Sequence, residues 1–179
     1  MKRGDLLYEG KAKKVFSTEN EKLFIVEFKD DATAFNGRKK GTISQKGIMN
    51  NAISSHFFKL LESRGIKTHF VKKLSDREML VKAVKIFQLE VVVRNIAAGG
   101  LASRLGLEEG VELISPILEL YYKNDALGDP MINNYHVMAL GLANPEELKT
   151  IEQMAFKINE ILKSYLLEKG ILLVDFKLE

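Results

Sequence analysis

The sequence predicts an α+β fold in which antiparallel sheets are flanked by helices. Strand-like runs come first, at residues 6–9, 14–17 and 23–29. Gly10 and a polar turn at 18–22 separate these runs, which is typical of a small antiparallel meander. Two later segments, 45–63 and 145–169, repeat apolar residues three and four positions apart, as amphipathic helices do.

The first predicted helix is followed by three further strand-like runs. Gly65 stands just past the helix, where a C-cap glycine belongs. The strands are expected at residues 68–73, 79–86 and 89–94. The last of them contains three consecutive valines and ends at Arg94, which predicts a strand buried on both faces.

The second predicted helix has clear start and stop signals. Asn144 is an N-cap residue, Pro145 suits the first helical position, and Glu147 completes a capping box. The apolar stripe ends at Gly170, so the final segment begins directly after the helix.

The final segment, Ile171–Glu179, is predicted to be a strand that places Asp175, Lys177 and Glu179 on one face. A sheet with one side in water would explain this pattern without any function. The functional interpretation is that the lysine balances two carboxylates that reach for a metal ion or an anionic substrate.

Composition excludes several classes of protein. The 179 residues include no cysteine, so neither a disulfide framework nor a thiolate metal site is possible, which suits a cytoplasmic protein. No apolar run approaches the ~20 residues of a membrane span. The net charge of +3 arises from 27 basic and 24 acidic residues that are interleaved, which argues against a nucleic-acid binder.

Familiar nucleotide and metal motifs are absent, and two weaker patterns remain. The sequence has no Walker loop and no dinucleotide-binding glycine fingerprint, and its three histidines lack metal-ligand spacing. The segment Tyr8–Phe16 could turn at Gly10 into a lysine-bearing flap over phosphates, although such turns are usually only solvated. A second polar group, Lys123 to Asn133, has the composition of an ordinary turn.

Taken together and in order, these segments resemble the SAICAR synthetase family over the whole chain. The segments that carry the resemblance are 8–16, 28–37, 46–51, 65–69, 90–99, 122–131 and 174–179, which includes an Asp-x-Lys-x-Glu strand. The resemblance implies a two-lobed, ATP-grasp-related fold. The implied lobes are residues 1–85, which bind ATP and carry the phosphate flap, and residues 86–179, which hold the substrate and metal site.

The resemblance further implies an ATP-dependent ligase of purine biosynthesis. Such an enzyme joins the carboxylate of the ribonucleotide CAIR to L-aspartate and releases ADP and phosphate, with Mg²⁺ as a second cofactor. The implied partners are these small molecules, with no membrane and no nucleic acid, and a homodimer is one candidate assembly. The competing hypothesis is a catalytically silent nucleotide-binding module of the same fold.

Site residues follow from matching positions. For ATP they are Gly10, Lys11, Ala12, Lys13, Val15, Lys82 and Lys123. For the substrate they are Arg94, Gly99, Gly100, Asp129, Asp175 and Lys177, and of these Arg94, Asp175 and Lys177 are expected to act in catalysis. Glu179 is the expected Mg²⁺ ligand. The aspartate site is left open, with Phe35-Asn36-Gly37 as one candidate.

Three departures from the family pattern have expected consequences. Gln88 replaces a proline, which alters only local stiffness. Gly100 replaces a serine or threonine whose hydroxyl would bind the ribonucleotide phosphate, so CAIR affinity is expected to fall roughly 10- to 150-fold unless the backbone at Gly99-Gly100 compensates. Family members also continue past Glu179, and we expect a shortened chain to have an uncovered strand edge and low activity.

Overall fold

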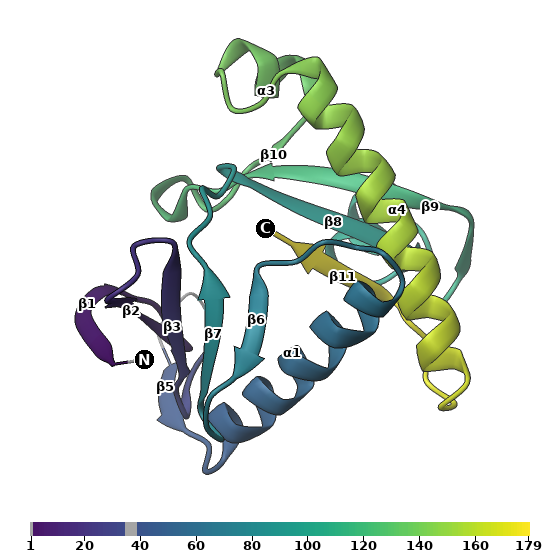
Figure 1. Cartoon of the computed structure of the whole chain (residues 1–179). Coiled ribbons are helices and arrows are strands. Elements are labelled where there is room, and N and C mark those ends of the chain that lie inside the picture. Colours follow the sequence, from purple (N-terminus) through teal and green to yellow (C-terminus); the bar gives the residue numbers. More distant parts are fainter. Residues whose placement is uncertain (1, 35–38) are drawn as a thin grey trace. The chain divides into compact units, whose positions relative to one another are not determined.

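The computed structural model describes residues 2–34 and 39–179, and it divides the chain into two compact units, Met1–Lys85 and Ile86–Glu179 (Figure 1). The candidate aspartate segment Phe35-Asn36-Gly37 lies outside the described residues. The mixture of helices and antiparallel sheets confirms the predicted α+β class. No helix in the described part of the chain has the length and hydropathy that crossing a membrane requires.

The first unit is built on a five-stranded antiparallel sheet with the order β1-β2-β3-β7-β6. Its strands are β1 (Arg3–Glu9), β2 (Lys13–Thr18), β3 (Leu23–Phe28), β6 (Phe70–Lys73) and β7 (Glu78–Lys82). A separate hairpin pairs β4 (Asp31–Ala34) with β5 (Lys39–Thr42), and helix α1 spans Lys46–Ser63. The meander β1-β2-β3 is therefore confirmed. Strand β7 ends at Lys82, opposite Leu23, so the predicted extension to residue 86 is wrong.

Two polar anchors fix α1 against this sheet. The Asp30 carboxylate follows β3, accepts a 2.8 Å hydrogen bond from the Gly47 amide and forms a two-pronged ion pair with Arg77 at 2.6 and 2.9 Å. The fully buried Asn51 donates through Nδ2 to the carbonyl oxygens of residues 75, 76 and 78. These contacts tie the start of the helix to the turn that precedes β7. At its other end Gly65 has a φ of 81°, which suits the predicted C-cap glycine.

The second unit is built on a four-stranded antiparallel sheet with the order β10-β9-β8-β11. Its strands are β8 (Leu89–Ile96), β9 (Glu112–Tyr122), β10 (Met131–Ile132) and β11 (Asp175–Leu178). Its helices are α2 (Gly99–Leu105), a 3₁₀ turn η1 (Asp125–Leu127), α3 (Asn134–Ala139) and α4 (Pro145–Leu167). Figure 1 shows α4 lying across the strands of this unit.

One face of this sheet is apolar and forms the main core of the unit. Val91 and Val93 of β8 and Leu120 of β9 pack with Ala155 of α4, and Phe176 of β11 joins the same cluster. All three consecutive valines of β8 are at most 9% exposed, which confirms the predicted burial on both faces. The strand itself continues two residues past Arg94, so its predicted end is wrong.

A buried asparagine pair fixes the segment that enters β11. Asn95 and Asn159 exchange two 2.8 Å hydrogen bonds, and Asn95 also donates to the carbonyl of Leu173. The backbone amides of Asn95 and Ile96 both donate to the Val174 carbonyl. Regular pairing starts only at Asp175, so the predicted strand start at Ile171 is wrong. The predicted capping box at Asn144 and Glu147 is confirmed, with bonds of 2.9 and 2.8 Å.

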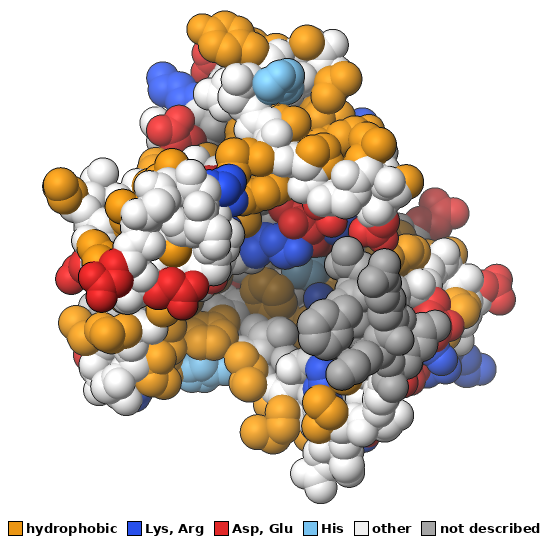
Figure 2. Space-filling model, turned by 180° about the vertical axis from the view of Figure 1, so that it is seen from behind, with side chains coloured by type: hydrophobic (Ala, Val, Ile, Leu, Met, Phe, Trp, Pro, Cys, Tyr) orange, Lys and Arg blue, Asp and Glu red, His pale blue; other side chains and the backbone are white. Residues whose placement is uncertain are grey.

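Apolar side chains are also exposed around α3. Figure 2 shows hydrophobic side chains at the surface over the end of the molecule that carries this helix in Figure 1. Met131, Tyr135, Met138 and Leu140 are large hydrophobic residues there, with 40–78% of their surface exposed.

The Asp30 anchor predicts acid-sensitive stability. The pairing with Arg77 and the Gly47 amide lower the pKa of Asp30 from 3.8 to about 2. A carboxyl group whose pKa is lower in the folded state stabilises that state fully above its unfolded pKa, and this contribution is lost as the pH falls from 3.8 through about 2. We therefore expect Asp30→Asn to lower the urea midpoint at pH 6 and the gap to wild type to narrow below pH 4.

The control for this measurement is Asp125→Asn, which removes an exposed carboxylate from the other unit. A gap between Asp30→Asn and wild type that is the same at pH 2.5 as at pH 6 would contradict the role of the anchor.

Candidate functional site

Strand pairing in the second unit gathers polar side chains from three strands on one sheet face. In the register, Asp175 lies opposite Arg94 and Lys177 opposite Val92, while Val92 lies opposite Glu119 on β9. Side chains of a strand alternate between faces, so Phe176 and Leu178 point to the core and their neighbours do not. The predicted shared face of Asp175, Lys177 and Glu179 fits this alternation.

Two lysines and two glutamates form an ion-pair network at one end of this face. The carboxylate of Glu90, whose side chain is 12% exposed, lies 2.7 Å from Lys177 Nζ and 3.6 Å from Lys123 Nζ. Lys123 Nζ also contacts Glu179 Oε1 at 2.9 Å, and Lys177 Nζ lies 3.8 Å from the same oxygen. The hydrogen bond that Lys123 donates to Glu179, against the opposing effect of burial, raises the pKa of Lys123. Lys123 is therefore held as a cation.

Two arginines form a second network around a buried carboxylate. Glu119 is 7% exposed; its Oε2 accepts from Arg94 Nε at 2.7 Å and from the Tyr121 hydroxyl at 2.8 Å, and its Oε1 accepts from Arg104. Arg94 NH1 in turn donates to Asp175 Oδ2 at 2.8 Å. Burial alone would raise the pKa of Glu119, but the bonds from Arg94 and Tyr121 outweigh it and lower that pKa. The buried carboxylate therefore stays ionised and holds both guanidinium groups.

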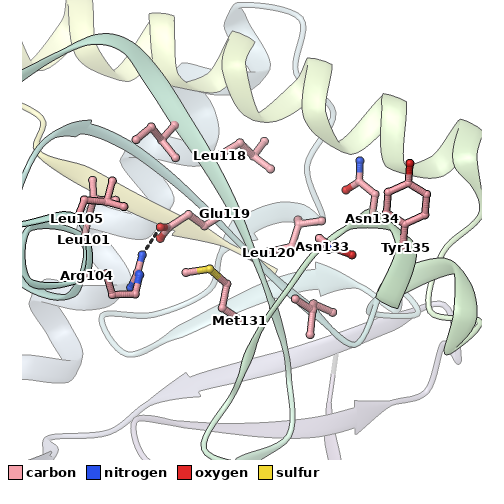
Figure 3. Close-up of a pocket in the computed structure, with 12 residues that line it drawn as sticks. Leu101, Arg104, Leu105, Leu118, Glu119, Leu120, Met131, Asn133, Asn134 and Tyr135 are labelled. Carbon is pink, nitrogen blue, oxygen red and sulfur yellow. Dashed lines mark hydrogen bonds and ion pairs between the residues drawn. The ribbon is translucent and has the colours of Figure 1, made fainter.

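An open pocket of about 540 Å³ adjoins the second network (Figure 3). Figure 3 shows Arg104 of α2 and Glu119 of β9 pointing toward each other, with Met131 beside them and the leucines of α2 beyond. Asparagine and tyrosine side chains line its other end, namely Asn133, Asn134 and Tyr135.

The two glycines at the start of α2 differ in backbone conformation and in their hydrogen bonds. Gly99 has a φ of 51°, which favours glycine, and its amide already donates to Glu109 Oε1 at 2.9 Å. Gly100 has no such φ, and a Cβ placed on it would meet only Arg104 NH1, at 3.2 Å.

The Asp129 carboxylate stabilises the turn in which it lies. The φ of this residue is 49°, and its Oδ1 accepts a 2.8 Å hydrogen bond from the Asn124 amide. The ordinary-turn interpretation of this segment therefore accounts for one carboxylate oxygen, and a substrate contact would use the other.

In the first unit the predicted flap is the connection between β1 and β2. The Gly10 amide donates to the Lys13 carbonyl at 2.9 Å, and the Lys29 amide donates to the Ala12 carbonyl at 2.8 Å. The tip is thus closed by its own turn and tied to the end of β3. Lys11 and Lys13 are exposed, and Lys13 Nζ lies 5.4 Å from the centre of the Phe28 ring.

The charges of Lys13 and Lys82 both affect the pKa of His69. Burial, then the charges of Lys13 and Lys82, lower the pKa of His69 against the opposing effect of Glu62. The imidazole lies edge-on to Phe58 at 4.9 Å, and Lys82 Nζ donates to the Thr68 carbonyl at 3.0 Å. The two lysines predicted for ATP therefore share one electropositive region of this unit.

Sequence reasoning missed four members of the second unit's networks: Glu90, Arg104, Glu119 and Tyr121. Polar residues recur at even spacing in both strands, since Glu90 and Arg94 lie four positions apart and Glu119, Tyr121 and Lys123 two positions apart. The run of valines hid the first pattern, and β9 was not predicted.

No group of three or more His, Asp or Glu side chains that could hold a metal ion occurs among the described residues. On the polar face, Glu90 and Glu179 both pair with Lys123.

Comparisons with known proteins agree on one family. Residues 6–179 match the family model described as SAICAR synthetase. The phosphoribosylaminoimidazole-succinocarboxamide synthase of Thermoanaerobacter sp. (strain X514) is 62% identical over 179 residues, all of this chain and 76% of that protein.

Two solved structures show the same fold. The synthase from Ehrlichia chaffeensis aligns with a TM-score of 0.94 and 47% identity over 97% of this chain and 73% of that one. A SAICAR synthetase in complex with ADP aligns with a TM-score of 0.92 and 55% identity over 95% of this chain and 72% of that one.

The shared effect of two lysines on His69 can be tested directly. We expect Lys13→Met and Lys82→Met each to raise the pKa of His69, because each removes a positive charge that disfavours the imidazolium. An NMR titration of the histidine ring measures this pKa. Lys11→Met is the matched control on the same flap and should leave the value unchanged. If neither substitution changed the pKa of His69, the two lysines would not share an electrostatic effect on this histidine.

Proposed function

This chain belongs to the SAICAR synthetase family, and from that premise we propose which residues carry out the ATP-dependent joining of CAIR to L-aspartate. The reaction is a ligation in purine biosynthesis. A carboxylate is a poor electrophile, so we propose that a CAIR carboxylate oxygen first attacks the γ-phosphorus of ATP and ADP leaves. The aspartate amine then attacks the acyl phosphate, and phosphate and a proton are released.

We assign nucleotide binding in the first unit to the flap and to Lys82. Lys11 and Lys13 would contact the phosphates together with the Ala12 amide, because the Gly10 amide is used within the turn. Val15, on β2, is assigned to the same site. The support is the region around His69, where two lysine charges already act together. That one related synthetase was solved with ADP agrees with a nucleotide site of this kind.

We assign CAIR to the polar face of β8 and β11. Lys177 would hold the carboxylate that is to be activated, and Asp175 an amino group of the imidazole. Arg94 fixes Asp175 through their 2.8 Å bond, and the ribonucleotide phosphate would lie at Gly99 and Gly100. Lys123 would face the transferring phosphate, and Asp129 would orient a substrate group through its free oxygen.

Holding these groups in place is the main catalytic contribution of such a face. Orientation of reacting groups can lower a barrier by ~7 to 11 kcal/mol. Cations that are already fixed need no rearrangement as charge develops on the phosphoryl group. Lys123 and Lys177 are held close to such positions beforehand, because each contacts two carboxylates, and they would pass from these carboxylates to the substrate.

The residues present fit Mg²⁺ of the phosphate-bridging kind. Such an ion commonly takes one or two carboxylates and completes its shell with water and substrate phosphates. Glu179 and Glu90 would supply the carboxylates, and the bound ion would neutralise phosphate charge. Each of these carboxylates pairs with a lysine in the structure, Glu179 with Lys123 and Glu90 with Lys177.

The proposal also covers the cellular location and the oligomeric state of the enzyme. Cytoplasmic location is supported by the absence of cysteine from all 179 residues, which suits a reducing compartment. The exposed apolar side chains around α3 would suit assembly as a homodimer.

The observation that carries the proposal is the polar face on which Lys177, Asp175 and Arg94 meet. Lys177→Met should weaken CAIR binding about 10- to 150-fold, because a hydrogen bond to a charged group is lost, and should leave Mg-ATP binding unchanged. Calorimetric titration of the full chain with each ligand measures both affinities.

Lys157→Met is the matched control, since Lys157 is an exposed lysine of α4 in the same unit. CAIR affinity that is unchanged in Lys177→Met would remove this lysine from the site. An unmodified chain that binds ATP but not CAIR would instead support the silent nucleotide-binding module.

A further inference from the structure

One lysine beside the phosphate flap holds this flap by two separate contacts. We infer that Lys29 is a positioning residue for ATP binding: its backbone and its side chain fix the turn that carries Lys11 and Lys13, and it does not itself contact the phosphates. The inference rests on the proposed nucleotide site in the first unit. It adds a residue that was not predicted for ATP from the sequence.

Lys29 lies at a rigid point of the first unit. It directly follows β3, whose last residue, Phe28, is 3% exposed and belongs to the core. The next residue, Asp30, is the anchor that pairs with Arg77 and accepts from the Gly47 amide. Because both of its neighbours in the chain are held, the backbone of Lys29 is a fixed point from which the flap can be positioned.

The backbone and the side chain of Lys29 contact different parts of the flap. The Lys29 amide donates to the Ala12 carbonyl at 2.8 Å, at the tip of the turn. Lys29 Nζ donates to Glu9 Oε1 at 2.6 Å, and Glu9 is the last residue of β1 before the turn. One residue therefore holds the flap at its tip and at its base.

The ammonium group of Lys29 is held on its other side by the hairpin that follows. Lys29 Nζ lies 2.6 Å from Oδ2 of Asp31, the first residue of β4, and the Asp31 carbonyl accepts from Lys46 Nζ of α1 at 2.8 Å. With 17% of its side chain exposed and two carboxylates at 2.6 Å, Lys29 is held more firmly than Lys177, which is 48% exposed with its second carboxylate at 3.8 Å. Its charge is thus balanced within the protein, so it acts through Glu9 and not as a phosphate ligand.

Both partners of the contact at the base of the flap are ionised at neutral pH. The hydrogen bond from Lys29 lowers the pKa of Glu9. The hydrogen bonds to Asp31 and then to Glu9 raise the pKa of Lys29. A turn that is already held in its binding conformation loses less freedom when a ligand binds, so the contact favours ATP binding without touching ATP.

Calorimetric titration of the 179-residue chain with Mg-ATP tests the inference. Lys29→Met removes both ion pairs and should weaken Mg-ATP binding about 2- to 5-fold, the range expected for the loss of partly exposed pairs. Lys29→Arg can keep both contacts and should restore the affinity close to that of wild type. Lys59→Met is the matched control at an exposed lysine of α1 and should leave the affinity unchanged.

A second variant distinguishes positioning from direct contact with phosphate. If Lys29 acts through Glu9, Glu9→Gln should also weaken Mg-ATP binding, and the double variant should lose less affinity than the two single losses combined. Hydrogen exchange of the Gly10 amide, which closes the turn, should become faster in both single variants. Mg-ATP binding that is equal or stronger in Glu9→Gln would overturn the inference. This variant carries the test if Lys29→Met does not fold.

The remaining outcomes separate this inference from the proposed nucleotide site. Mg-ATP affinity equal to wild type in Lys29→Met would overturn the inference, and so would an equal loss of Mg-ATP and CAIR affinity, which would indicate a general structural role. Lys13→Met should weaken Mg-ATP binding by itself. If it did so while Lys29→Met did not, only the role of Lys29 would fail. If Lys13→Met had no effect, the flap site would fail and this inference with it.

Discussion

The pairing of β11 with β8 is the constraint on which the candidate substrate site depends. It brings Asp175 beside Arg94, a residue 81 positions earlier in the chain, and it places Lys177 within 2.7 Å of Glu90. Asn95, which exchanges two buried hydrogen bonds with Asn159 of α4, also donates to the Leu173 carbonyl and so holds the chain just before β11. A hydrogen-bonded polar pair inside a core specifies one register, because any slip would leave buried amide groups unpaired.

The polar face that results is electrically balanced. Lys123, Lys177, Arg94 and Arg104 contact four carboxylates, those of Glu90, Glu119, Asp175 and Glu179, so the formal charges cancel. An anionic substrate on this face would therefore exchange partners with these carboxylates and would not meet a bare positive patch. Of these cations, Arg94 is the hardest to exchange, because it is 13% exposed and contacts the buried Glu119, and Lys177, at 48% exposed, is the easiest.

Local signals in the sequence were sufficient for elements whose ends are set by their own residues. Asn144, Pro145 and Glu147 predicted the start of α4, and Gly65 marked the end of α1, because caps are short-range interactions. Strand ends at Lys82, Ile96 and Asp175 were predicted wrongly, because they depend on where a partner strand stops. Arg104 and Glu119 could not be paired from sequence, since only the packing of α2 against β9 brings them together.

The central claim is that CAIR binds on the polar face of β8 and β11 with its phosphate at Gly99 and Gly100. A crystal structure of the full chain soaked with CAIR tests this most directly. We expect density for the ligand with its carboxylate within hydrogen-bond distance of Lys177 and its phosphate beside Gly99 and Gly100. Well-defined CAIR density that contacts neither Lys177 nor Asp175 would contradict the account.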